Sequence, residues 1–227
     1  MRVTQVFTAV VGVCLLAVAA PVAAQTPAAS KPAPAMSSDS GFQIGVLAGL
    51  GAVQNVGGLF GVEAGYKINK NIQIDAEGFW MQDAITRARL DAATGLATSL
   101  TSSLGKSTTI TVTAPTTYGG GGLKFFIPMD GNVHPYVALG AGVAKIAYTP
   151  TFTVGGADVT TSLSTYGITL GSDFTGDVTK VAITGGLGVQ IERNRLAIDI
   201  GIRLTSIQTD SQSTNVLRAH VGLGYKF

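Results

Sequence analysis

The sequence predicts an all-β protein, an eight-stranded antiparallel up-and-down β-barrel that spans a membrane. Eight segments alternate between apolar residues and polar or small residues, which is the two-residue period of a strand. Charged residues make up only 12% of the chain and hydrophobic residues 46%, whereas about a quarter of a typical soluble domain is charged. Beyond residue 24 no apolar run reaches the length of a membrane helix. In lipid only helices and closed barrels satisfy their backbone groups, so a barrel follows.

The first 24 residues have the layout of a cleaved secretory signal peptide. Met1 and Arg2 form a short positive start, residues 6–20 are an apolar run, and the small residues of 22–24 precede Gln25. A transmembrane helix fits less well, because the run is short and small residues follow it directly. We therefore expect a signal peptide over residues 1–24, a Pro/Ala/Ser-rich periplasmic leader over 25–40 and the barrel over 41–227.

Cysteine and charge usage exclude several classes of function. The single cysteine, Cys14, lies inside the apolar run of the predicted signal peptide and follows Val13, which is too large for a lipoprotein signal. The mature chain is therefore expected to have no disulfide, no lipid anchor and no cysteine-based catalytic or metal site. The net charge of +2 and the lack of a basic cluster argue against nucleic-acid binding.

The alternating segments define the expected strands. The clearest covers residues 196–205, where large apolar residues such as Ile198 and Ile200 alternate with small or polar ones such as Asp199 and Arg203. One face of this strand suits lipid, and its length suits a tilted membrane-spanning strand. The eight expected strands cover residues 42–53, 60–68, 72–82, 117–127, 133–148, 181–192, 196–205 and 217–227.

The connections between these segments alternate in length. Residues 69–71, 128–132 and 193–195 are short turns, whereas 83–114 and 149–177 are long. Short periplasmic turns and longer external loops are typical of outer-membrane barrels, so both termini are expected in the periplasm. Residues 107–113 alternate again and predict a hairpin that projects beyond the membrane, while a short helix near 84–93 is an alternative. External recognition is expected from these loops, with a partner that the sequence does not identify.

Aromatic residues fall at two levels of the predicted lipid face, as in the girdles of membrane barrels. Phe60 and Trp80 lie near the outer end. The periplasmic end carries Phe42, Tyr66, Phe125, Tyr225 and Phe227.

The predicted inward face carries charges of both signs. An eight-stranded barrel is barely wide enough for its own side chains, and isolated buried charge is costly. We therefore expect a plugging salt-bridge network, the alternative being a charged lumen that passes ions. The expected network comprises Glu63, Lys67, Asp75, Glu77, Lys124, Lys180, Glu192, Asp199, Arg203, Arg218 and His220, with Lys226 on the same face.

Glycines on the inward face leave another interpretation open, a cavity that holds water or a small ligand. They also ease the curvature of a small barrel. These glycines are Gly120, Gly122, Gly140, Gly142, Gly186, Gly188, Gly222 and Gly224.

Catalysis has little support in the sequence. Neither His134 nor His220 has a serine two residues away on a lipid-facing strand, so both are expected to be structural. Residues 119–122 are four glycines, but no helix pattern and no Lys-Ser/Thr pair follows them, so they are not a phosphate loop. No metal-ligand spacing appears, and no cofactor is expected.

The C-terminal strand carries a resemblance to a known class of proteins. Val221, Leu223, Tyr225 and Phe227 alternate and end in an aromatic residue. In this the chain resembles outer-membrane β-barrel families, in particular the OmpA-like eight-stranded transmembrane domain. The resemblance implies residence in outer-membrane lipid and recognition of these four residues by the barrel assembly machinery. Larger relatives continue into a peptidoglycan-binding domain, and because this sequence stops at Phe227 that anchoring role is not expected.

These observations predict a non-enzymatic, monomeric outer-membrane barrel with a structural role, a surface-interaction role through its long external loops, or both. A small channel or ligand carrier with a partly open lumen is the main competing hypothesis. A lipid-modifying outer-membrane enzyme is a weaker one. For the fold, the competing architecture is a soluble exported β-sandwich.

Overall fold

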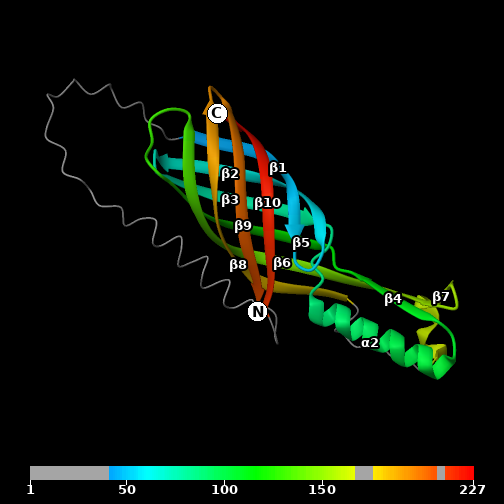
Figure 1. Ribbon diagram of the computed structural model, residues 1–227. Coiled ribbons are helices and arrows are strands. Elements are labelled where there is room, and N and C mark those ends of the chain that lie inside the picture. Colours follow the sequence, from blue (N-terminus) through cyan, green and yellow to red (C-terminus); the bar gives the residue numbers. More distant parts are fainter. Residues whose placement is uncertain (1–40, 167–175, 209–212) are drawn as a thin grey trace, which may run out of the picture. The chain divides into compact units, whose positions relative to one another are not determined.

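The computed structural model describes residues 41–166, 176–208 and 213–227 (Figure 1). The predicted signal peptide and periplasmic leader lie outside these residues. Eight long strands form the main body: β1 (Gly41–Ala52), β2 (Val56–Asn69), β3 (Ile72–Met81), β5 (Thr116–Phe126), β6 (Val133–Val154), β8 (Gly176–Arg193), β9 (Leu196–Gln208) and β10 (Ser213–Lys226).

These eight strands pair antiparallel in chain order and close into a ring. β6 pairs with β8 over the whole length of the barrel. The last strand returns to the first, with β1 and β10 paired from Gln43 opposite Lys226 to Ala52 opposite Leu217. Closure leaves no strand edge unpaired within the wall, as lipid requires. The predicted eight-stranded barrel is thus confirmed.

Side chains alternate between the outside and the inside of the barrel. In β9, Ile198 and Ile200 are exposed on the outer wall, whereas Asp199 and Arg203 are buried inside. The outer wall is lined by large apolar residues, 38–73% exposed, which also include Val46, Phe60, Leu139, Ile183 and Val221. A lipid-facing wall requires this distribution, because apolar side chains there meet acyl chains rather than water.

Several of the expected strands are shorter than the observed ones at the end with the long loops. β6 continues to Val154 instead of ending at residue 148, and β8 begins at Gly176 instead of residue 181. β9 and β10 are likewise longer at this end. The apolar alternation marks only the part of a strand that lies at membrane level. Hydrogen-bonded pairing continues beyond that level through residues rich in threonine and serine, where an apolar face is not needed.

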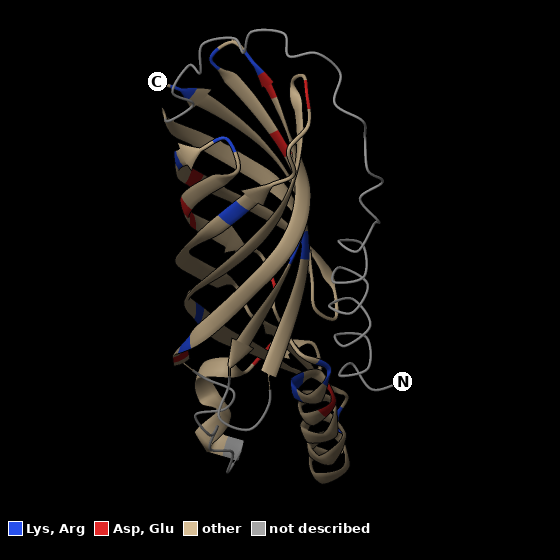
Figure 2. Ribbon diagram, turned by 90° about the vertical axis from the view of Figure 1, so that its left-hand side faces the viewer, with Lys and Arg blue, Asp and Glu red and all other residues tan. Residues whose placement is uncertain are grey.

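An extension continues from this end of the barrel. It contains α2 (Arg87–Leu104), β4 (Thr108–Thr113), β7 (Ala157–Asp158) and the short 3-10 helix η1 (Thr160–Tyr166). β4 pairs with the distal part of β6, from Thr108 opposite Val154 to Thr113 opposite Thr149. In Figure 2, α2 projects beyond the barrel end opposite the C-terminus. The expected projecting hairpin and the alternative helix are therefore both present, one after the other.

Helix α2 forms in a serine- and threonine-rich stretch whose hydroxyl groups are satisfied by the helix itself. Thr94, Thr98 and Thr101 each donate to the carbonyl four residues earlier. Gly105 ends the helix in the left-handed region, with φ of 62°, and its N–H donates to the Thr101 carbonyl. Within residues 41–166, 176–208 and 213–227, no helix is long and apolar enough to cross a membrane.

Candidate functional site

The lumen near the short turns holds a network of buried charges. Lys124 on β5 lies at its centre, where its Nζ is 2.5 Å from Glu63 Oε1 and 2.9 Å from Asp199 Oδ2. The Tyr136 hydroxyl donates to Asp199 Oδ1 at 2.7 Å, and His220 Nε2 lies 3.2 Å from the same oxygen. Asp199 therefore joins three partners from three other strands.

Two arginines extend this network toward the other half of the lumen. Arg203 contacts Glu77 at 2.8 Å and Glu63 at 3.2 Å, with Asp75 3.8 Å away. Arg218 pairs with the second oxygen of Glu77. Because charged partners come from β2, β3, β5, β9 and β10, the ion pairs tie opposite walls of the barrel together. Buried charges must be paired in this way, since an unpaired ion at such a site is strongly destabilising.

A second, smaller group lies at the mouth near the short turns. Glu192 pairs with both Lys67 and Lys226, and Gln190 donates to Glu192 at 2.9 Å and to Gln43 at 3.1 Å. Glu192 is only half-buried, as expected for a charge close to the barrel end.

The structure brings ten of the eleven predicted lumen charges into these two groups. The remaining one, Lys180, lies on the inward face of β8 opposite Ala144, at the level where Ala144 and Ala182 are fully buried. Lys180 is half-exposed there.

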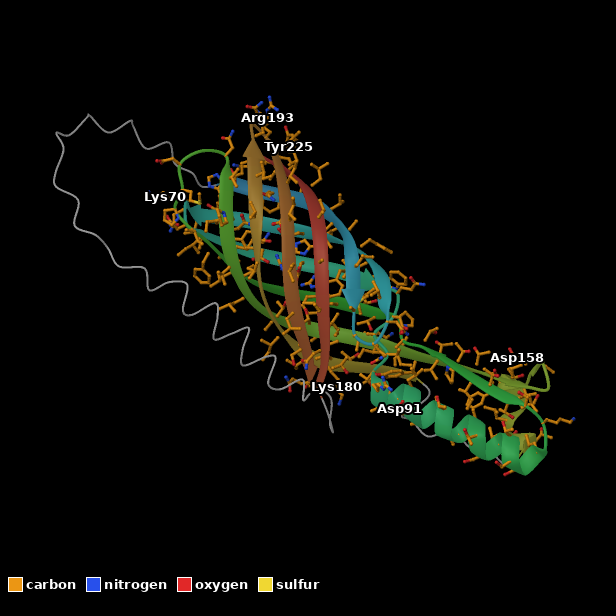
Figure 3. The ribbon with its side chains drawn as sticks, viewed as in Figure 1. Lys70, Asp91, Asp158, Lys180, Arg193 and Tyr225 are labelled. Atoms are coloured by element: carbon orange, nitrogen blue, oxygen red, sulfur yellow. The ribbon has the colours of Figure 1, made fainter. Side chains whose placement is uncertain are left out.

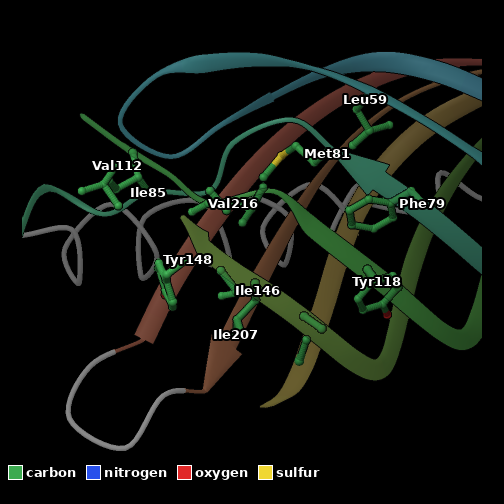
Figure 4. Packing of buried hydrophobic residues seen from close by; sticks show 14 of the residues in the cluster. Leu59, Phe79, Met81, Ile85, Val112, Tyr118, Ile146, Tyr148, Ile207 and Val216 are labelled. Atoms are coloured by element: carbon green, nitrogen blue, oxygen red, sulfur yellow. The ribbon is translucent and has the colours of Figure 1, made fainter. Parts of the chain in front are cut away.

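The other half of the lumen is filled by an apolar cluster, which the sequence pattern alone did not predict (Figure 4). The Phe79 and Tyr118 rings stack with centroids 4.8 Å apart, and the Arg218 guanidinium lies 4.2 Å from the Phe79 centroid. This stack marks the border with the charged half. Beyond it, the barrel strands contribute Leu47, Leu59, Met81, Ala144, Ile146, Tyr148, Ala182, Ile207 and Val216.

Residues of the extension complete the apolar cluster. Ala84, Ile85 and Ala93 from the α2 segment and Val112 and Ala114 from the β4 segment are buried in it. The Ala84 N–H donates to the Ala114 carbonyl, and the Ala114 N–H donates to Asp83 Oδ1. The extension thus shares a core with the barrel and covers its outer mouth. The sequence signal for this cluster is the two-residue alternation itself, because the inward positions of several strands become apolar toward this end.

Some of the inward glycines make room for large side chains. A Cβ added at Gly188 would lie 2.5 Å from the Tyr136 hydroxyl oxygen, and one at Gly120 would overlap the Tyr118 hydroxyl. The lumen hollow near the network has a volume of about 10 Å³, with Gln43, Glu63, Asp199 and His220 among its lining residues. That is about the space of a single water molecule.

The two histidines lie in different surroundings. His220 is buried against Asp199, and His134 begins β6 opposite Gln190, half-buried. In the described part of the chain, no group of three or more His, Cys, Asp or Glu residues is placed to hold a metal ion.

The aromatic residues of the two predicted girdles lie on the outer wall, where the alternation predicts them. The apolar side chains of the C-terminal strand lie on the same wall. The Phe60 and Trp80 centroids are 5.1 Å apart. Phe227 lies 5.9 Å from Phe42 and 5.1 Å from Tyr225 at the short-turn end. Val221, Leu223, Tyr225 and Phe227 are all exposed on this wall.

Known proteins share this architecture. Neisserial surface protein A is 12% identical, with a TM-score of 0.51 over 83% of this chain and 97% of that one. Ail, the attachment invasion locus protein of Yersinia pestis, is 16% identical, with a TM-score of 0.46 over 85% of this chain and 100% of that one. The N-terminal barrel of Pseudomonas aeruginosa OprF is 12% identical, with a TM-score of 0.45 over 83% and 100%.

At these identities the likeness to neisserial surface protein A shows the fold alone. No sequence among the curated proteins matches this chain. The sequence does match the family described as outer membrane protein beta-barrel domain, over residues 12–227. Because this match covers nearly the whole chain, the protein belongs to the outer membrane protein β-barrel domain family.

Proposed function

We propose that this outer-membrane protein is a non-enzymatic, closed barrel that carries a folded extension on the cell surface for contact with an external partner. The observation that carries the proposal is the filling of the lumen from both sides, by ion pairs in one half and by apolar side chains in the other. A barrel filled in this way supports a scaffold role. The extension is then the part best placed to meet other molecules.

The extension has the properties of a stable contact element. It has a small core of its own, formed by Phe152, Val154, Val159 and Leu163, against which Leu100, Leu104 and Ile110 pack. It is joined to the barrel by the uninterrupted strand β6 and by the shared apolar cluster. A rigid connection of this kind fixes the direction in which a contact surface points.

One face of the extension is open and rich in threonine, with exposed Asp158 of β7 opposite Thr153 at its end. Three threonine pairs lie directly opposite each other on β4 and β6: Thr109 with Thr153, Thr111 with Thr151, and Thr113 with Thr149. All are exposed except the half-buried Thr153. Ile110 and Phe152 lie on the other face, toward α2. The threonine face is therefore the surface that we propose for external contact.

We further propose the orientation and biogenesis that this role requires. The signal peptide over residues 1–24 is cleaved after export, and the short turns and both termini face the periplasm. The barrel assembly machinery reads the exposed Val221, Leu223, Tyr225 and Phe227, and the barrel functions as a monomer. Support comes from the asymmetry of the connections and from the exposed C-terminal strand face.

A complementation experiment tests the proposal. Cells that lack the gene would receive the full chain, a Thr109→Lys/Thr113→Lys variant, or a matched Ser99→Lys/Ser102→Lys variant on the exposed side of α2. All three should restore resistance of the envelope to detergent. Only the threonine-face variant should lose attachment to surfaces or cell aggregation. Equal attachment by all three would remove the contact role and leave a purely structural one.

Channel activity and lipid modification have their own tests. The purified full chain should give no stepwise current in planar lipid bilayers at any voltage, because the lumen is filled; steady conductance would favour the channel. Replacing His134 and His220 should leave lipid A composition unchanged, and a change would favour the lipid-modifying enzyme.

A further inference from the structure

Two arginines lie on the lipid-facing side of the short turn between β8 and β9. Arg193 is directly opposite Leu196, which is also paired with Tyr225. Residues directly opposite each other in an antiparallel pair share a face, and Leu196 and Tyr225 are exposed on the outer wall. Arg193 is therefore on the lipid side. Figure 3 shows Arg193 and Tyr225 together at this end of the barrel.

The second arginine is held at the same place by a specific contact. Arg195 Nη1 donates a hydrogen bond of 3.0 Å to the Tyr225 hydroxyl. Asn194 between the arginines has a left-handed backbone, with φ of 54°, which forms the tight turn that brings them together. The Arg195 guanidinium thus lies beside Tyr225 of the aromatic girdle, and Arg193 lies two residues away on the same side of the turn.

The charges at this end are segregated by strand face. Glu192, the residue before Arg193, points inward and forms ion pairs with Lys67 and Lys226. Neither Arg193 nor Arg195 forms an ion pair with any residue in the described ranges. At the other end of the outer wall the situation differs, because exposed Lys145 is paired with Asp177 at 2.5 Å. The two arginines of this turn are therefore available to an external anion.

We propose that Arg193, Arg195 and Tyr225 bind the phosphate of an anionic phospholipid in the leaflet next to the short turns. A guanidinium group offers five N–H donors in a plane, and one donor of Arg195 is used by Tyr225. The remaining donors of Arg195 and all those of Arg193 are left for a phosphate on this side of the turn. The girdle residues Tyr225, Phe227 and Phe42 pack beside this position, where the acyl chains begin.

The inference rests on the proposed insertion of this barrel in a membrane, with the short turns at the periplasmic leaflet. It is independent of the proposed contact role of the extension. Its test is therefore made on the purified full chain in maltoside detergent, where both barrel ends are accessible and orientation has no effect. Heat-dependent mobility on a gel shows separately that each variant is a folded barrel.

The experiment titrates phosphatidylglycerol and phosphatidylcholine and counts bound lipid by native mass spectrometry. The wild type should bind one phosphatidylglycerol in preference to phosphatidylcholine. Each basic residue near an anionic surface changes affinity about fivefold, so Arg193→Gln/Arg195→Gln should weaken binding by about tenfold or more. Tyr225→Phe should weaken it less, because the charges remain. Lys106→Gln, which removes one exposed positive charge from the extension, should have no effect.

Two results would overturn the inference. Unchanged phosphatidylglycerol binding by the double arginine variant would place the lipid elsewhere, and an equal loss in Lys106→Gln would reduce the effect to net charge. Inorganic phosphate and lipid A are titrated in parallel. If either binds the arginine pair more tightly than phosphatidylglycerol does, the site is not one for an anionic phospholipid.

Discussion

The half of the lumen near the short turns is filled by charged side chains, whereas the half near the extension is filled by apolar ones. In the charged half each side chain depends on particular partners, as Lys124 does on Glu63 and Asp199. In the apolar half, contacts are less directional, and residues of the extension such as Ile85 and Val112 join the same cluster as Ile146 and Ile207 of the barrel.

The difference shows how one barrel both fixes its strands relative to one another and holds an extension beyond the membrane. Ion pairs across the charged half fix the strands relative to one another, because a buried charge that loses its partner is strongly destabilising. The apolar half gains stability from burial, and it extends past the membrane without a change in chemistry. The extension is therefore held by the part of the core that tolerates added residues, and perturbing either half should have distinct effects.

The largest effect is expected from Glu77→Gln. Glu77 is 6% exposed and pairs with both Arg203 and Arg218, so the change leaves two buried arginines without a full counter-charge. The free energy of unfolding, measured in urea with the barrel in lipid vesicles, should fall by about 3–5 kcal/mol. Asp177→Asn, in the exposed ion pair with Lys145, is the control and should cost about 1 kcal/mol or less. Similar losses in both variants would contradict a special role for the buried half.

A somewhat smaller loss is expected from Ile207→Ala in the apolar half. Ile207 is 1% exposed and lies in the cluster shared with the extension. The free energy of unfolding should fall by about 2–4 kcal/mol, since a cavity forms where the side chain packed. Protease cleavage within the extension should accelerate as well, because its anchor is weakened. Ile202→Ala, on the outer wall, should leave that cleavage unchanged. Faster cleavage in this variant would mean that the extension is not anchored by the inward face alone.

These halves also differ in how far the sequence predicts them. Alternation assigns Glu63, Asp199 and Arg203 to the inward face, since the period of two is local information. The partners are not local: Lys124 and Glu63 are 61 residues apart, and Arg218 and Glu77 are 141 apart. Strand register and stagger decide which charges meet, and neither is encoded in a single strand. Lys180 shows the same limit, because alternation gives its inward face but not its height on β8, which is opposite Ala144.

The apolar half follows from the same two-residue alternation, although the charges on the inward face are the more prominent feature of the sequence. Met81 and Ile207 occupy inward positions by the same alternation that places Glu77 and Arg203 inside. Helix α2 was harder to predict in full, since serine and threonine are weak helix formers. Its hydroxyl groups bond to its own backbone, and its few apolar residues find partners only once β4 and β6 have paired.

A smaller effect is expected when side-chain volume is added at one position of the apolar half and removed at its neighbour. A Cβ added at Gly51 would overlap the side chain of Met81, which supplies its three nearest atoms. Gly51→Ala should therefore lower the free energy of unfolding by about 1–2 kcal/mol. In a double-mutant cycle with Met81→Ala the two changes should couple favourably by about 1 kcal/mol. In the charged half, a Cβ added at Gly65 would overlap the Gln73 side chain. Gly65→Ala with Gln73→Ala therefore provides the matched double-mutant cycle. Additive losses at Gly51 and Met81 would mean that the cluster rearranges freely.

The smallest effect should be confined to the extension and should depend on pH. The Thr160 hydroxyl and backbone N–H donate to Asp158 Oδ1 at 2.6 and 2.9 Å, and these bonds lower the pKa of the exposed Asp158 carboxyl from its ordinary value of 3.8. Because the folded pKa lies below the unfolded one, the contribution to stability is present above pH 3.8 and is lost as the pH falls through the folded pKa. Amide exchange at Thr160 should then accelerate, while amides of the charged half stay protected. Asp158→Asn should remove this acid-dependent step; an unchanged step would assign it to another group.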